Sequence, residues 1–400
     1  MGPQIAAART AAASTCRRVY DIGESAAVWV ALLAGLGEMT TRGNQREPRV
    51  GSPLALGIVG CGRFATEYHL PALAREARCV LAAICEPAPT PELKRRAATT
   101  NVPIVESVDE LLGAHALDAA LISTPHAVHA ELIGECLSAG LHVLVDKPFV
   151  LELADAERLT LLAEKQELVA GVGFNRRVAE AYLYGRHLIT SGALGEIRHV
   201  DSLQLGYPSE GWYAEASVSG GPFLGRGAHL ADVVPWLLDS TPLSIVARAA
   251  GGGNGSPLAT GGWWDVEFPG VRWRATILPH GLAMYDEVRI FGEEGYVIVR
   301  RPTGNLTWPP RTKAGAAAML AWEAEHYDRG KGSQRPSAPP EAERRTLVGD
   351  FVDAVIDGNR LACSFREAIG SVAITAAATE SCLGGGERLP LSDLLHAEGL

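Results

Sequence analysis

The sequence predicts an α/β chain with two folded domains: a doubly wound parallel sheet, and after it a larger, mostly antiparallel open sheet. In the first half, short apolar runs alternate with helical patterns, and strands that alternate with helices form a parallel sheet covered on both faces. Beyond Arg177, apolar runs follow one another across Gly and Pro turns without helices between them, which is typical of an antiparallel sheet. At 400 residues the chain is long enough for two or three domains.

The individual elements follow from the pattern of apolar residues. In the first domain we expect strands at about 56–59, 79–85, 119–123, 142–145 and 169–174, with helices near 91–99, from 126 onward and at 152–166. In the second we expect a helix near 179–190 and then strands at 197–205, 244–249, 263–268, 271–278, 288–291 and 296–299. Residues 301–340 are rich in Pro, Gly and charge, which indicates a long surface excursion. A last amphipathic helix is expected at 341–356, because Asp357-Gly358 is a helix stop signal.

The first 52 residues differ in composition from the rest. The apolar run at 26–36 is too short to span a membrane. Arg17-Arg18 ahead of this run suggests an export signal, but two acidic residues interrupt the pattern and no A-x-A site follows. We expect a disordered or non-native extension, with translation starting at Met39. The domain boundaries are then expected at 1–52 for the extension, 53–174 for the parallel-sheet domain and 175–400 for the second domain.

Composition limits the partners and the compartment. The net charge of -10 argues against a nucleic-acid or anionic-membrane surface, because such surfaces need clustered Lys and Arg. The seven cysteines form no CxxC pair, and several lie in predicted strands or helices as small apolar residues. We therefore expect a cytoplasmic protein without a metal site.

The most informative stretch is the turn that follows the first predicted strand. It reads Gly60-x-Gly62-x-x-Ala65, and Glu86 follows about 24 positions beyond Gly62. Gly60 permits a tight turn, Gly62 lets the backbone approach a pyrophosphate, and Ala65 allows the next helix to pack close to the strand. The N–H groups at the start of that helix favour bound phosphate. Although Gly-rich turns also serve packing alone, Glu86 after a second apolar run favours a Rossmann dinucleotide-binding domain.

Three further segments are candidates for the reacting centre. Ligands of an open parallel sheet bind at the carboxyl ends of its strands, where the sequence places residues 123–129 and Asp146-Lys147-Pro148. A Lys beside an acid is often a solvated surface pair, but its place after the fifth strand favours a functional role. His229 follows a glycine-dense loop; a lone His there is commonly structural, although the glycines favour close approach of a ligand.

Taken together, these segments resemble the Gfo/Idh/MocA family of NAD(P)-dependent oxidoreductases. The resemblance runs from about residue 54 to the end and rests on several motifs in the family's order: the 60–65 turn, His69-Leu70-Pro71-Ala72, Thr124-Pro125 with His129, Gly140-Leu141-His142-Val143, Asp146-Lys147-Pro148, the run from Gly173 to Arg177, and Gly220-Gly221 with His229. It implies a C-terminal α/β domain with an open antiparallel sheet, homodimers or homotetramers through that sheet, and sugars or cyclitols as usual substrates.

The resemblance also implies roles for individual residues. Lys147 matches the lysine that touches the substrate hydroxyl and the nicotinamide ribose, and His229 matches the histidine that acts as general acid/base. A neutral imidazole can take the hydroxyl proton as hydride leaves, and a cationic lysine can stabilise the developing alkoxide. The expected cofactor contacts are Gly60, Gly62, Arg63, Phe64, Ala65, Glu86, Thr124, Pro125, His129, Asp146 and Lys147. The expected substrate contacts are Lys147, Arg176, Trp212 and His229, together with Arg177 and with Tyr213, which stands beside Trp212 in the loop ahead of Gly220.

The sequence departs from the family pattern near His229. Family members that use this histidine usually carry an Asp four residues earlier, where this chain has Gly225. Asp232 lies on the same helix face and is either a substitute for that Asp or a structural carboxylate. Pro235 should kink this helix. Asp146 replaces the usual Glu, a shorter side chain with the same charge.

These observations predict a cofactor and an activity, and they leave two alternative functions open. We expect NAD as cofactor rather than NADP, because Glu86 should accept the ribose hydroxyls and repel a 2′-phosphate, although Arg63 or the cluster at 94–96 could reach one. The expected activity is hydride transfer between this cofactor and a sugar, cyclitol or related polyol or ketone. Two alternatives remain: a redox-neutral, glycosidase-like NAD-dependent enzyme, and a non-catalytic NAD(H)-binding sensor, for which the loss of the Asp at Gly225 is the motive.

Overall fold

The computed structural model describes residues 52–206, 209–250, 261–279, 285–301, 306–307 and 345–391. The chain divides into two compact units. The first comprises the described residues up to Gly173 together with Glu210–Ser219 and Leu347–Phe365; the second comprises the described parts of Phe174–Ser209, Gly220–Thr346 and Arg366–Leu400. The expected extension at 1–52 lies almost wholly outside the described residues, and so does most of the expected surface excursion at 301–340.

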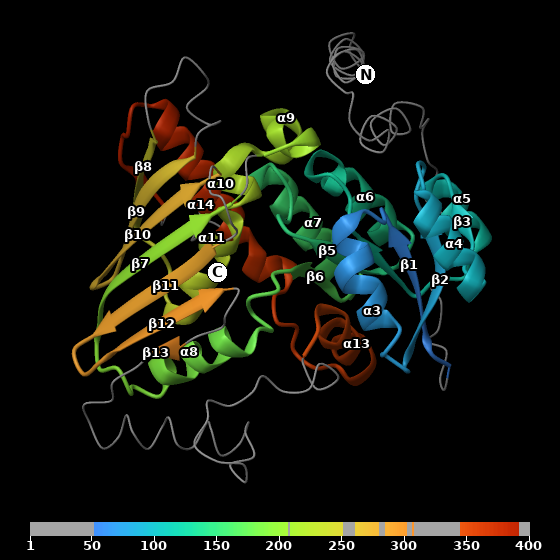
Figure 1. The fold of residues 1–400 in the computed structure, drawn as a ribbon, viewed down its shortest axis with the longest axis horizontal. Coiled ribbons are helices and arrows are strands. Elements are labelled where there is room, and N and C mark those ends of the chain that lie inside the picture. Colours follow the sequence, from blue (N-terminus) through green and yellow to red (C-terminus); the bar gives the residue numbers. More distant parts are fainter. Residues whose placement is uncertain are drawn as a thin grey trace. The chain divides into compact units, whose positions relative to one another are not determined.

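The first unit is built on a six-stranded, fully parallel sheet with the order β3-β2-β1-β4-β5-β6 (Figure 1). Its strands are β1 (Leu54–Val59), β2 (Cys79–Cys85), β3 (Ile104–Val105), β4 (Ala119–Ile122), β5 (His142–Asp146) and β6 (Ala170–Gly173). The chain moves outward from β1 to β3 and then crosses back to β4. This reversal of strand order creates the switch point that the sequence predicts.

Helices connect these strands. They are η1 (Ala65–His69), which has π-helical geometry, α3 (Leu70–Leu73), α4 (Pro91–Thr100), α5 (Val108–Ala114), η2 (His126–Val128), α6 (His129–Ser138) and α7 (Leu153–Lys165). The apolar face of β1 packs with Leu73, Leu93 and Leu121 into a continuous core. Burial of this apolar surface is the main stabilising term, at about 25 cal/mol per Å².

A late part of the sequence completes the first unit. Helix α13 (Leu347–Asp357) adds Val348, Phe351 and Val352 to the core. The backbone then pairs with β6, since the N–H of Val172 donates to the carbonyl of Cys363 at 3.0 Å. The boundary expected at residue 174 is therefore crossed by a segment that lies close to the C-terminus.

The second unit contains an eight-stranded sheet with the order β13-β12-β11-β7-β10-β9-β8-β14 (Figure 1). Its strands are β7 (Ile197–Leu205), β8 (Ser244–Ala249), β9 (Gly262–Phe268), β10 (Val271–Leu278), β11 (Tyr285–Gly292), β12 (Tyr296–Arg301), β13 (Leu306–Thr307) and β14 (Leu389–Pro390). Most neighbours are antiparallel, as the sequence predicts, but β7 and β10 run parallel.

Helices cover one face of this sheet. They are α8 (Glu180–Thr190), α10 (Gly221–Gly225), α11 (Ala228–Leu238) and α14 (Phe365–Leu383), whose first residue belongs to the first unit. Trp264 and Trp273 are fully buried on the covered face. Alternate residues of β7 and β10 are exposed or half-buried on the other face, which accounts for the alternating apolar pattern.

The sequence misses the shorter elements β3, α5, α10, β13 and β14 and the long helix α14. The last predicted helix begins at Leu347 within the described residues and ends at Asp357, one residue after the predicted end. Helix α11 continues through Pro235 to Leu238. No helix in the described part of the chain is long and apolar enough to cross a membrane.

Candidate functional site

The Gly-rich turn at the end of β1 combines one crowded glycine with one open glycine. Gly60 has a φ of +82°, and a Cβ at this position would lie 2.6 Å from the carbonyl oxygen of Ser123. A Cβ on Gly62 would meet no atom within 4 Å. Gly60 is therefore required by the turn itself, whereas the missing side chain of Gly62 leaves space beside the backbone, as a bound pyrophosphate requires.

The residues after the turn begin the first helical segment. Ala65 is fully buried, so its small side chain allows close packing. The N–H of Thr66 donates to the carbonyl of Gly62 at 3.0 Å. Arg63 is exposed and its Nε donates to Glu67 at 2.9 Å, while the ring of Phe64 stacks on Tyr68.

Glu86 joins the end of β2 to this turn. Its carboxylate is buried and accepts hydrogen bonds from the N–H of Cys61 at 2.9 Å and from the N–H of Ala88 at 3.1 Å. Each carboxylate oxygen has a further lone pair that a ribose hydroxyl can use. The turn and Glu86 therefore fit the phosphate and ribose portions of a dinucleotide.

Asp146, at the end of β5, is held from two sides. Its Oδ1 lies 2.8 Å from Nε2 of His69, and its Oδ2 accepts a hydrogen bond from the hydroxyl of Ser123. Asp146 and His69 are both buried. These contacts fix the carboxyl end of β5, from which Lys147 projects.

His129 is completely buried beneath two loops. Its Nε2 faces the carbonyl of Thr124 at 3.1 Å, and its Nδ1 faces the carbonyl of Pro148 at 2.9 Å. Burial lowers the pKa of His129. In this position the ring connects the loop after β4, which includes Pro125, to the loop after β5.

Lys147 contacts a segment from far along the sequence. We call Glu210–Ser219 the 210–219 segment; it contains η3 (Gly211–Ala214) and α9 (Ala216–Ser219) and belongs to the first unit. Nζ of Lys147 donates to the hydroxyl of Tyr213 at 2.8 Å and lies 5.4 Å from the centre of its ring.

His126 supports the same segment. Its Nδ1 donates to the carbonyl of Ser219 at 2.8 Å, and its ring makes edge contacts with Trp212 and Tyr213 at centroid distances of 4.8 and 5.3 Å. Complete burial, together with the nearby charge of Lys147, lowers the pKa of His126 well below its ordinary value. The imidazole is therefore neutral at physiological pH, and its other nitrogen carries a lone pair.

The second unit holds the remaining predicted site residues. His229 is half-buried in the first turn of α11, with its ring edge toward Phe174. Arg176 is buried and paired with Asp286.

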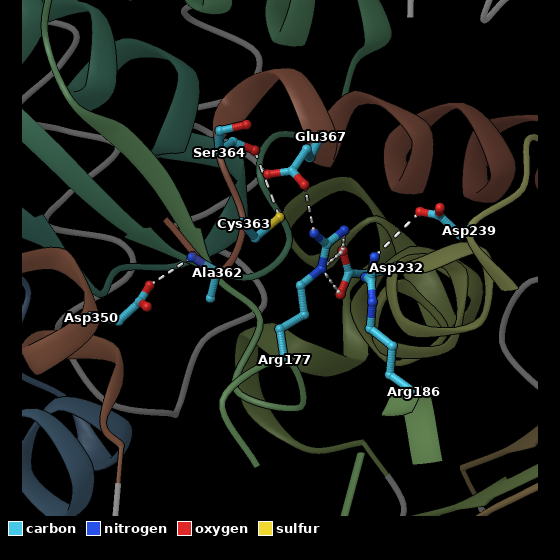
Figure 2. A network of polar contacts seen from close by, with 9 residues as sticks. All are labelled: Arg177, Arg186, Asp232, Asp239, Asp350, Ala362, Cys363, Ser364 and Glu367. Atoms are coloured by element: carbon cyan, nitrogen blue, oxygen red, sulfur yellow. Dashed lines mark hydrogen bonds and ion pairs between the residues drawn. The ribbon is translucent and has the colours of Figure 1, made fainter. Parts of the chain in front are cut away.

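Asp232 is committed to a buried ion pair in the second unit (Figure 2). The guanidinium of Arg177 donates to its carboxylate through Nη2 at 2.6 Å and through Nε at 3.0 Å. Glu367 lies 3.3 Å from the same guanidinium. Of the two interpretations of Asp232, a structural carboxylate is therefore favoured over a partner for His229.

The sequence does not predict several of these contacts. His69 and Ser123 occur in the motifs without a predicted role. Tyr213 is expected to contact substrate, and its hydrogen bond with Lys147, 66 residues away, is not predicted. Among the described residues, no three His, Cys, Asp or Glu side chains are grouped so that they could hold a metal ion.

Comparison with known families agrees with this geometry. The model of the Gfo/Idh/MocA oxidoreductase family, with its NAD-binding Rossmann fold, matches residues 54–174. The model of the Gfo/Idh/MocA C-terminal domain matches residues 182–298. Together they cover more than half of the 400 residues. The chain therefore belongs to the Gfo/Idh/MocA oxidoreductase family, and its first domain is the NAD-binding Rossmann fold of that family.

Individual relatives cover different shares of the chain. An uncharacterised oxidoreductase of Schizosaccharomyces pombe is 32% identical over 49% of this chain and 55% of its own length, so the similarity spans about half of that relative. The rhizopine catabolism protein MocA of Rhizobium meliloti is 26% identical over 86% of this chain and 97% of its own length. A 1,5-anhydro-D-fructose reductase of Ensifer adhaerens is 28% identical over 51% of this chain and 64% of its own.

Solved structures share the fold at low sequence identity. The WlbA dehydrogenase of Bordetella pertussis, crystallised with NADH and UDP-GlcNAcA, has a TM-score of 0.69 at 20% identity and covers 84% of this chain and 98% of its own. A putative myo-inositol dehydrogenase of Sinorhizobium meliloti has a TM-score of 0.66 at 20% identity over 84% and 99% of the two chains.

Proposed function

We propose that the protein is a dehydrogenase or reductase that transfers hydride between a nicotinamide cofactor and a CH–OH or carbonyl group of a sugar, cyclitol or related polyol. The observation that carries the proposal is the placement of Lys147 at the carboxyl end of β5, in the same sheet whose β1 turn and Glu86 fit a dinucleotide. Two of the similar proteins, a 1,5-anhydro-D-fructose reductase and a putative myo-inositol dehydrogenase, support this substrate class.

Different residues of the chain would bind the cofactor and act on the substrate. Bound nicotinamide supplies the hydride acceptor or donor. The turn from Gly60 to Ala65 would receive the pyrophosphate, and Glu86 the adenosine ribose. The Lys147 ammonium would stabilise negative charge on the reacting oxygen, and His229 would take or return its proton.

The choice between NAD and NADP rests on Glu86. Its carboxylate is already fixed by two backbone N–H groups, and a 2′-phosphate beside it would face unfavourable charge. We propose NAD as the preferred cofactor. Calorimetric titration with NADH and NADPH tests this, and equal affinity for the two would contradict it.

Turnover and binding together test the proposed function. We expect purified protein to bind NADH, to act on at least one member of a polyol and ketose panel, and to lose about 10²-fold or more in turnover on Lys147→Ala. A protein that binds neither pyridine nucleotide would refute the proposal.

One observation favours a second candidate. Since the usual Asp is replaced by Gly225 and Asp232 is paired with Arg177, a non-catalytic NAD(H) sensor fits an altered acid/base centre. NADH-dependent binding of a partner protein without turnover would favour the sensor; net reduction of the cofactor would exclude both the sensor and the redox-neutral enzyme.

We also propose a homodimer or homotetramer formed through the open face of the second unit's sheet. Half-buried aromatic residues such as Phe291 and Tyr296 lie on β11 and β12 of this sheet, and the ion pair of Asp265 with Arg274 lies on β9 and β10. Light scattering after gel filtration tests the assembly; a monomer at micromolar concentration would contradict it.

A further inference from the structure

The surroundings of Lys147 include Tyr213, for which the sequence suggests only contact with the substrate. A lysine side chain has four rotatable bonds, and holding its ammonium in one direction costs up to about 2 kcal/mol of rotamer entropy. A catalytic ammonium therefore needs a partner that keeps it in place before the substrate arrives. In this chain the hydroxyl of Tyr213 accepts a hydrogen bond from Nζ at 2.8 Å.

The ring of Tyr213 is itself held in place. It packs against Trp212 at 4.9 Å between ring centroids and against the edge of His126 at 5.3 Å. His126 is anchored in turn by its hydrogen bond to the carbonyl of Ser219, at the other end of the 210–219 segment. Contacts therefore run from Ser219 to His126, from His126 to the ring of Tyr213, and from the hydroxyl of Tyr213 to Lys147. We call these residues the support of Lys147.

The charge of this support suits its position. A protonated histidine beside Lys147 would repel the ammonium, but buried His126 is neutral, so a positive Lys147 can lie beside it. The hydroxyl of Tyr213 accepts without bringing a competing negative charge. A carboxylate in its place would form an ion pair and weaken the field that the ammonium presents to a reacting oxygen.

We propose that Tyr213 is a positioning residue for Lys147, with its hydroxyl fixing the direction of the ammonium and neutral His126 fixing the ring. This inference rests on the proposed function, in which Lys147 faces the reacting oxygen. No proton leaves Tyr213 in this arrangement; the phenol accepts the hydrogen bond from Nζ and directs the remaining N–H groups of Lys147.

A substrate-free experiment tests the contact. Acetic anhydride at about pH 8, with mass spectrometry of the peptide that contains Lys147, measures how readily the amine reacts in the full-length protein. We expect Tyr213→Phe to raise the acetylation rate of Lys147 at least threefold, because the ammonium loses the acceptor that holds it. The matched control Tyr184→Phe removes a hydroxyl in α8 of the second unit and should leave the rate unchanged. His126→Asn should raise the rate in the same direction, since it removes the ring that supports Tyr213.

The remaining measurements separate positioning from structure. In Tyr213→Phe we expect unchanged NADH affinity, a fall in kcat of about tenfold to hundredfold, and less than a threefold change in KM. An unchanged acetylation rate, or wild-type kcat in Tyr213→Phe, overturns the proposal. If the wild type turns over no member of the polyol and ketose panel while the acetylation contrast is present, the proposed function fails and the hold of Tyr213 on Lys147 stands.

Discussion

Replacing Asp232 with alanine distinguishes the two roles considered for this carboxylate. The change removes one side of a buried ion pair in which the Arg177 and Asp232 side chains are only 5% and 1% exposed (Figure 2). The Asp232 carboxylate receives Nη2 at 2.6 Å and Nε at 3.0 Å. In the variant, the guanidinium of Arg177 therefore stays buried but loses the carboxylate of Asp232 that balances its charge.

The expected size follows from this geometry. Removing one partner of a buried pair costs about 3–5 kcal/mol, because the other charge remains desolvated. Glu367 stays 3.3 Å from the guanidinium, and its side chain is 26% exposed, so it compensates part of the charge. We therefore expect Asp232→Ala to lower the free energy of unfolding by about 3 kcal/mol, at the lower end of that range.

Urea unfolding followed by circular dichroism measures the loss, read as a shift of the midpoint at constant slope. Asp239→Asn is the control: Asp239 pairs with Arg186 at 3.3 Å, but its side chain is 76% exposed, and Asn also tolerates the left-handed backbone of this position (φ +49°), so the expected change is below about 0.5 kcal/mol. The reasoning is refuted if Asp232→Ala is as stable as Asp239→Asn. It is also refuted if a fully stable Asp232→Ala loses turnover by about 10³-fold or more, the pattern of an orienting carboxylate.

The other predictions concern the cofactor turn and one titrating helix residue. Gly62→Val should keep the fold, because its Cβ meets no atom within 4 Å, but should weaken NADH binding at least tenfold; unchanged affinity in calorimetry would place the pyrophosphate elsewhere. Gly60→Ala should instead lower the free energy of unfolding by about 2 kcal/mol or more, since Gly60 has a φ of +82° and a Cβ would lie 2.6 Å from a carbonyl oxygen; wild-type thermal stability would contradict this. Burial, then the charges of Glu131 and Asp109, raise the pKa of Glu135 from 4.5 to about 7. The native state therefore binds more protons than the unfolded state between these values, and this group's contribution to stability is lost as pH rises through 7. Glu135→Gln should match the wild type in thermal unfolding near pH 4.5 and exceed it by about 1–2 kcal/mol near pH 8, after allowance for solvent screening; equal stability at both pH values would contradict the assignment.

Local signals made much of the fold predictable. Helix α4 illustrates this, since its predicted span of 91–99 differs by one residue from the observed Pro91–Thr100. The hydroxyl of Thr90 accepts from the N–H of Leu93 at its start, Pro91 begins its first turn, and Asn101 ends it in the left-handed conformation. Each signal acts within a few residues, so it is legible without the tertiary structure.

Non-local pairing was not predictable in the same way. Strand β7 runs parallel to β10, although 65 residues lie between the end of β7 and the start of β10. The alternation of apolar and polar residues in each strand does not specify whether its neighbour runs parallel or antiparallel. Strand β3 has only two residues, too few for a period to show. The pairing of Cys363 with β6 likewise depends on the chain coming back to the first unit's sheet late in the sequence. The hydrophobic pattern around Cys363 does not specify that contact.

The contrast between local and non-local contacts also applies to the candidate site, in which the cofactor-binding end and the reacting end are built differently. The cofactor end is made by residues that lie close together in the sequence: Glu86 accepts from the N–H of Ala88 in its own loop and from the N–H of Cys61, 25 residues earlier, in the turn after β1. The reacting end that we propose depends on the 210–219 segment, which lies between β7 and α10 in the sequence and brings Tyr213 to Lys147. Because loops vary more freely than the elements they connect, changes in this segment can alter the direction of the Lys147 ammonium while the dinucleotide turn stays the same. Substrate choice should therefore follow the 210–219 segment rather than the glycine motif, which explains why the sequence predicts the cofactor class and leaves the substrate open.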